Sequence, residues 1–156
     1  MTARLNLFTN ELGAKHLKYL VSAGKVLTDS SLPTSLQELV SLRVSQINGC
    51  AMCVDIHTKH LAHEGEDAVR INLVTAWREA TVYTEAERAA LDLAEQATRI
   101  ADASGGVPDE VWTNATKHYP ENELAALISL IALMNAMNRL NVTTQNPAGA
   151  YAVGQF

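Results

Sequence analysis

Apolar residues recur every three or four positions along most of the chain, which is the period of an amphipathic helix. In the second such segment, Leu36, Leu39, Val40 and Val44 are apolar at helical spacing. The alternation of apolar and polar residues that is typical of a half-buried strand is not found. The pattern therefore predicts an all-α fold. We expect helices over about residues 14–28, 35–47, 50–63, 66–74, 84–103, 108–117 and 120–142, and an irregular tail over 143–156.

The residues between these segments have the chemistry of helix ends. Asn48 and Gly49 form a stop signal and a tight connector after the second helix. Thr84 and Glu87 have the spacing of a capping box, which marks the start of a helix. No stretch has the composition of a linker between domains, and a length of 156 residues suits one hydrophobic core. We therefore expect a single domain over residues 1–156.

The last predicted helix contains the most apolar stretch of the chain, from Leu124 to Leu140. Asn135, Asn138 and Arg139 interrupt its C-terminal part, so the uninterrupted apolar run is too short to cross a bilayer comfortably. A helix that is apolar on most faces is typically buried inside a domain or between subunits. We therefore expect no membrane span, and we expect a homo-oligomer that covers part of this helix.

Composition and charge exclude several classes of partner. Hydrophobic residues make up 47% of the chain and the formal net charge is −5. The chain has no block of Lys and Arg, so we expect no nucleic-acid partner. The first residues lack the apolar core of a signal peptide, which makes a cytoplasmic location the expectation.

The chemistry of the chain is concentrated in the third predicted helix. Cys50 and Cys53 are its two cysteines, and His57 follows four residues after the second. Positions i, i+3 and i+7 lie along one face of a helix, so two thiols and a potential base share one stripe. The positive end of the helix dipole favours a thiolate at Cys50. The two sulfurs are within reach of a disulfide, and the His57 imidazole can reach Cys53 directly or through one water.

Two other interpretations of this segment remain open. The cysteines can be two small buried apolar residues with no chemical role. A zinc site made by both cysteines, His57 and His60 is excluded by geometry, because one continuous helix cannot surround one ion with four ligands. A partial site with Glu38 in place of His60 stays an alternative. We expect neither a metal ion nor a cofactor, and we interpret His60 and His63 as solvated or capping residues.

The spacing of these residues resembles a known family. Glu38 is followed by eleven residues, then by Cys50-Ala51-Met52-Cys53, then by three residues and His57. This pattern is similar to that of the AhpD-like alkylhydroperoxidases, which belong to the wider carboxymuconolactone decarboxylase superfamily. The resemblance is specific over 38–63 and extends more loosely to the remaining helices. Periodicity alone favours an exposed Glu38, whereas the resemblance gives it a function.

The resemblance implies an AhpD-like helical bundle that forms homotrimers or homohexamers. It implies that Cys53 is the peroxidatic cysteine, that Cys50 resolves it, and that His57 relays protons to Glu38. The expected activity is that of a thiol-dependent peroxidase or disulfide reductase, with a peroxide substrate and an external dithiol protein as reductant. The alternative is a cofactor-free decarboxylase, or a non-redox binding protein, of the same superfamily. Met52 departs from the pattern, because the best-known branch has a histidine at this position.

Overall fold

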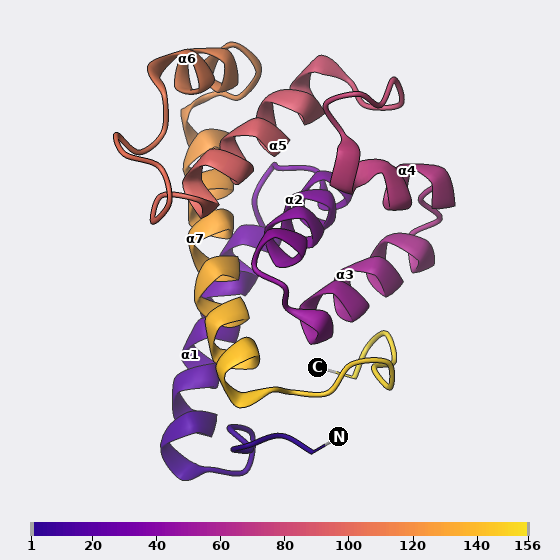
Figure 1. The fold of residues 1–156 in the computed structure, drawn as a ribbon, viewed down its shortest axis with the longest axis vertical. Coiled ribbons are helices and arrows are strands. Elements are labelled where there is room, and N and C mark those ends of the chain that lie inside the picture. Colours follow the sequence, from indigo (N-terminus) through magenta and orange to yellow (C-terminus); the bar gives the residue numbers. More distant parts are fainter. Residues whose placement is uncertain (1, 156) are drawn as a thin grey trace.

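The computed structural model describes residues 2–155, which fold into seven α-helices and one short 3-10 helix with no strand among them (Figure 1). This confirms the all-α prediction. The elements are α1 (Glu11–Thr28), α2 (Thr34–Ile47), α3 (Ala51–His63), α4 (Ala68–Leu73), η1 (Val74–Ala76), α5 (Glu85–Thr98), α6 (Asp109–His118) and α7 (Glu121–Thr144).

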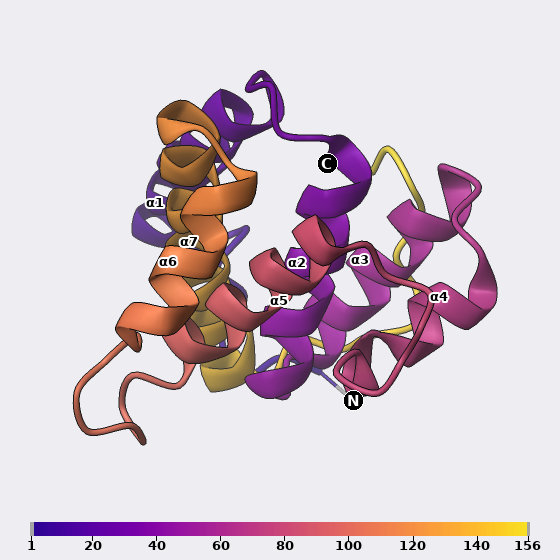
Figure 2. The same cartoon turned by 90° about the horizontal axis from the view of Figure 1, so that it is seen from above.

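The helices form three groups across the molecule, with α2 and α5 between the others (Figure 2). On one side lie α1, α6 and α7, and on the other lie α3 and α4. The buried face of α2 contributes Val40 and Val44 to a core shared with α5 and α7, while Leu39 packs into a second cluster with Leu61 of α3. Because α2 belongs to both clusters, it holds α3 in place relative to α7.

The long helix α7 is apolar on most of its circumference, as the sequence indicates. It is long and apolar enough to cross a membrane by length and composition. In this fold Leu127 and Ile131 are buried in the core against α2 and α5, whereas Ile128 is 41% exposed. The helix therefore serves as a core element that keeps one apolar strip uncovered in the single chain.

Two of the predicted helix ends differ from the structure. The first helix begins earlier than predicted, because the Asn10 side chain accepts a hydrogen bond from the Gly13 backbone and caps it. The fifth helix ends at Thr98 and not near residue 103, because the backbone from Arg99 onwards turns back on itself. Ile100, which the periodicity assigns to the apolar face of this helix, is consequently 57% exposed.

Two large apolar residues are exposed in the single chain. Val21 on α1 is 60% exposed and Trp112 on α6 is 44% exposed. Both helices lie on the outside of the molecule, so one apolar face of each has no neighbour within the chain. The aromatic side chains of Trp77 and Tyr119, in contrast, are buried.

The C-terminal tail returns across the molecule and lies along α3 (Figure 1). Gln145 ends α7 with a positive φ of 54°, which turns the chain out of the helix. The backbone N–H of Gly149 then donates to Asp55 Oδ2 at 2.7 Å, and Lys59 donates to the carbonyl of Tyr151 at 2.8 Å. These contacts hold the tail against the helix that carries the two cysteines.

Candidate active site

The two cysteines lie at the start of α3 and form a disulfide. Cys50 is the N-cap residue of the helix and Cys53 is in its first turn, with their Cα atoms 5.3 Å apart. The preceding Gly49 has a φ of 66°, a left-handed conformation that glycine adopts at little cost. This turn lets the backbone N–H of Cys50 donate to the Ser45 carbonyl at 2.9 Å, which fixes the cysteine pair against the end of α2.

Two hydrogen-bond donors point at the sulfur atoms. The backbone N–H of Cys53 donates to Cys50 Sγ at 3.3 Å, and the amide Nδ2 of Asn141 on α7 donates to Cys53 Sγ at 3.4 Å. Both cysteines are buried, with 1% and 4% of their surface exposed. A donor to a sulfur stabilises its anionic form, and in this disulfide form each sulfur accepts one such hydrogen bond.

A buried amide network connects α7 to the connector before the cysteines. Asn138 is fully buried, and its amide donates to Ser45 Oγ at 3.1 Å while its carbonyl oxygen accepts from Asn48 Nδ2 at 3.0 Å. Sequence reasoning treated Asn135 and Asn138 as interruptions of an apolar run. The signal that could have predicted the network is the spacing of these two residues with Asn141 along one helix. Amides that recur at three-residue intervals in an apolar helix must find hydrogen-bond partners where that helix contacts another.

Glu38 turns inward from α2 and pairs with α3. Its carboxylate oxygen Oε2 lies 2.7 Å from His57 Nδ1, and the side chains are 18% and 12% exposed. The expectation from periodicity that Glu38 is exposed is therefore wrong, and the pairing agrees with the family resemblance. Burial opposes ionisation of Glu38, but the hydrogen bonds and charges of His57 and His60 outweigh it and hold the pKa of the carboxyl below its usual value.

His60 is a member of this cluster, which corrects its interpretation as a solvated residue. Its Nδ1 lies 3.3 Å from Glu38 Oε1, and its Nε2 lies 2.7 Å from the hydroxyl of Tyr151 on the tail. The sequence placed His60 one turn after His57 but offered no signal for Tyr151, which is 91 positions away.

Of the two routes expected between His57 and Cys53, directly or through one water, the direct hydrogen bond is not found among the described residues. In residues 2–155 the side chain that donates to Cys53 Sγ is Asn141, and His57 pairs with Glu38. The four predicted site residues are thus brought together as two pairs on α3 and α2, namely the disulfide and the Glu–His pair.

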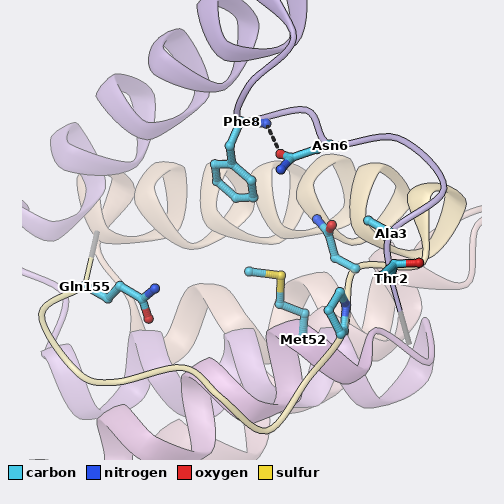
Figure 3. A pocket seen from close by; sticks show the side chains of 8 residues that line it. Thr2, Ala3, Asn6, Phe8, Met52 and Gln155 are labelled. Atoms are coloured by element: carbon cyan, nitrogen blue, oxygen red, sulfur yellow. Dashed lines mark hydrogen bonds between the residues drawn. The ribbon is translucent and has the colours of Figure 1, made fainter.

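Two neighbouring cavities lead to the disulfide. The smaller, of about 220 Å³, is lined by Gly49, Cys50, Ala51, Met52, Asn141, Val142, Gln145 and Asn146. The larger, of about 720 Å³, is lined by Thr2, Ala3, Asn6, Phe8, Met52, Asn146, Pro147 and Gln155. Figure 3 shows Met52 and Phe8 pointing into the larger cavity from opposite sides. Met52 and Asn146 line both cavities, so the two adjoin, and the smaller one reaches Cys50.

These features define an all-α protein with a CxxC cysteine pair beside a partly buried Glu–His hydrogen bond. Residues 14–96 match the model of the carboxymuconolactone decarboxylase family, and the chain belongs to this family. It is 35% identical over 150 residues to the uncharacterised protein YdfG of Bacillus subtilis (strain 168), covering 96% of this chain and 99% of YdfG. It is 31% identical over 119 residues to the uncharacterised protein YnjA of Escherichia coli (strain K12), covering 76% of this chain and 64% of YnjA.

Solved structures confirm the AhpD-like fold. The Agrobacterium tumefaciens protein ATU0492, described as a protein of unknown function and a candidate antioxidant defence protein AhpD, has a TM-score of 0.89 at 32% identity, over 96% of this chain and 100% of that one. A peroxidase-related protein from Silicibacter sp. TM1040 has a TM-score of 0.76 at 20% identity, over 91% and 74% of the chains. The debrominase Bmp8 has a TM-score of 0.72 at 20% identity, over 88% and 74%. At 20% identity, the likeness to the Silicibacter protein and to Bmp8 shows the fold alone.

Proposed function

We propose that this protein is a thiol-dependent peroxidase in which Cys53 reduces the peroxide and Cys50 closes the disulfide. The observation that carries the proposal is the Cys50–Cys53 disulfide at the start of α3, with the Glu38–His57 pair on the same side of the helix. Family membership and the likeness to ATU0492 support it. The activity is proposed for this chain and is not carried over from the fold, which also occurs in a debrominase.

The proposed cycle consumes one peroxide and one dithiol. The Cys53 thiolate attacks one peroxide oxygen, so that the S–O bond forms, the O–O bond breaks and the alkoxide leaves with a proton as an alcohol. Cys50 then attacks the sulfur of the sulfenic acid, which forms the S–S bond and releases water. An external dithiol reduces this disulfide through a mixed disulfide and is itself oxidised.

In this scheme the Glu38–His57 pair moves the protons. His57 takes the thiol proton from Cys53 through one water, because the imidazole makes no direct hydrogen bond to the sulfur. The ionised Glu38 stabilises the imidazolium that results, and its lowered pKa keeps it ionised near neutral pH. Asn141 holds the Cys53 sulfur while the proton leaves. Met52, which cannot carry a proton, contributes apolar surface to the cavity.

The partners and the setting are part of the proposal. A dithiol protein in the cytoplasm supplies the reducing equivalents, and the chain assembles as a homotrimer or homohexamer. The exposed apolar residues of α1 support assembly, since Leu12, Tyr19 and Val26 are each at least 65% exposed. An apolar face of this kind on a helix is typical of a protein interface.

The test is peroxide consumption by the purified protein with a small dithiol as reductant. We expect turnover in the wild type and none in Cys53→Ser. Cys50→Ser, reduced and then freed of the dithiol, is expected to complete one turnover and to accumulate a sulfenic acid on Cys53, which a dimedone adduct detects by intact mass. Peroxide consumption equal to that of a protein-free control would refute the proposal. A single turnover in Cys53→Ser and none in Cys50→Ser would exchange the roles of the two cysteines.

A further inference from the structure

Three side chains beside the disulfide have the arrangement of a metal site. Glu38, His57 and His60 each place one donor atom within 4.8 Å of the others. The two histidines lie one turn apart on α3, and the carboxylate comes from α2 between them. The sequence excludes a zinc site whose four ligands all lie on one helix, and keeps one with both cysteines, His57 and Glu38 as an alternative. The structure removes that objection, since the third ligand approaches from a second helix.

The donor set and its spacing fit a divalent transition metal. Two imidazoles and one carboxylate, with a position left for water, form a ligand set used by zinc and by other first-row metals. Metal bonds of about 2.0–2.2 Å at tetrahedral angles separate ligand atoms by about 3.3 Å. Glu38 Oε1 and His60 Nδ1 are 3.3 Å apart, and Glu38 Oε2 and His57 Nδ1 are 2.7 Å apart. Only small side-chain movements are needed to admit an ion.

The tail supplies the outer partner that a ligating histidine needs. Tyr151 places its hydroxyl 2.7 Å from His60 Nε2. In the metal-free protein Nδ1–H can donate to Glu38 Oε1, 3.3 Å away, while Nε2 accepts from the Tyr151 hydroxyl. In the other tautomer Nε2–H donates to that hydroxyl, and the lone pair of Nδ1 is available to a cation beside Glu38. Metal-bound histidines usually pair their second ring nitrogen in this way.

The cluster is open to solvent on one side. A cavity of about 140 Å³ is lined by Glu38, His60, His63 and Glu64, together with Thr34 and Val153. It gives an ion access to His60 and Glu38, and it has room for the water that would complete the coordination shell.

We propose that Glu38, His57 and His60 bind a divalent first-row transition-metal ion of the zinc type, with Tyr151 orienting His60. The ion uses the same atoms of Glu38 and His57 that share a proton in the metal-free protein, so the metal and the proton exclude one another at this place. It follows that a bound ion stops the proton relay. That consequence rests on the proposed function, whereas the metal site itself does not.

The experiment uses the protein in its disulfide form, so that neither sulfur is available as a thiolate ligand. Titration with Zn²⁺ by calorimetry at pH 7.5 is expected to give one site per chain, and Mg²⁺, which prefers oxygen ligands, is expected to give none. Co²⁺ is expected to give tetrahedral visible bands without a thiolate charge-transfer band. Failure of Zn²⁺ to bind the wild type would overturn the proposal whatever the outcome of the peroxidase assay.

Variants locate the site. His60→Asn keeps the Glu38–His57 pair and removes one ligand, so we expect Zn²⁺ affinity to fall at least about tenfold, the loss typical of even an outer partner. Tyr151→Phe is expected to weaken binding by about tenfold and to keep one site per chain. His118→Asn, at an exposed position on α6, is the matched control and is expected to bind as the wild type does. Equal affinity in His60→Asn and His118→Asn, with both variants folded by circular dichroism, would refute the assignment.

Discussion

The role of Glu38 can be tested by replacing it with an isosteric amide. Glu38→Gln preserves the shape of the side chain and leaves a carbonyl oxygen near His57 Nδ1, which is 2.7 Å from the carboxylate in the structure. The substitution therefore removes the charge and keeps a neutral hydrogen bond. Combined with Cys50→Ser, it leaves Cys53 as the one thiol in the chain, so that its reactivity is measured alone.

The expected loss follows from the strength of a charged hydrogen bond. Such a bond contributes about 1.5–3 kcal/mol, against about 1 kcal/mol for a neutral one. Because the two side chains are mostly buried, at 18% and 12% exposed, a value of about 2 kcal/mol within that range applies. A loss of about 1 kcal/mol in the stability of the imidazolium lowers the rate of Cys53 alkylation about fivefold at pH 7. His57→Gln removes the base itself and is expected to lower the rate further.

The assay is alkylation of the reduced protein by iodoacetamide, followed by intact mass from pH 6 to pH 10. The matched control is Glu64→Gln, because Glu64 is exposed and lines the cavity next to His60 without pairing with His57. At pH well above the thiol pKa the fivefold difference should disappear, since hydroxide then removes the proton. Equal rates for Glu38→Gln and Glu64→Gln at pH 7 would refute the relay, and a deficit that persists at high pH would assign Glu38 a structural role.

Further predictions follow from the same contacts. Two thiols should become untitratable after mild peroxide and return after dithiothreitol, and two thiols that persist after peroxide would contradict the redox cycle. Sedimentation equilibrium at micromolar concentration should give a multiple of 16.9 kDa, and the monomer mass would exclude the proposed assembly. Asn138→Ala removes two hydrogen bonds of a fully buried side chain, although Ser45 keeps its bond to the Ser41 carbonyl and Asn48 keeps its bond to Asn135, so urea denaturation should show a loss of about 2 kcal/mol. Burial opposes ionisation of Glu95, but hydrogen bonds led by the one from Arg43 hold the pKa of its carboxyl below 4.5. The free energy that the ionised carboxylate contributes to folding is therefore present above that pH and lost as the pH falls. The difference in unfolding free energy between wild type and Glu95→Gln should therefore narrow from pH 7 to pH 3.

Much of the site could be predicted from local spacing. Cys50, Cys53 and His57 belong to one helix, and the geometry of that helix determines that they share a face wherever the helix packs. The turn at Asn48 and Gly49 likewise places Cys50 at a helix start, because the stop signal depends on the backbone of a few adjacent residues. These features require no knowledge of the neighbouring helices.

The direction of Glu38 was decided by tertiary packing. Its place beside Leu39 and Val40 leaves it between the buried and the exposed face of α2, so periodicity cannot determine which way it points. In the structure α3 packs against α2 and brings His57 and His60 to the carboxylate. Hydrogen bonds to these two imidazoles make the inward orientation of Glu38 favourable, and a pattern of single residues does not contain that information.

The partners furthest along the chain were outside the reach of any local pattern. Asn141 meets the Cys53 sulfur from 88 positions away, and Tyr151 meets His60 from 91. The sequence by itself determined which residues form helices and which of them share a face, because those properties depend on backbone geometry over a few turns. The tertiary structure decided which faces meet, because helix contacts depend on the fit of whole surfaces, and that fit assembles the cysteines, the Glu–His cluster and the tail around the start of α3.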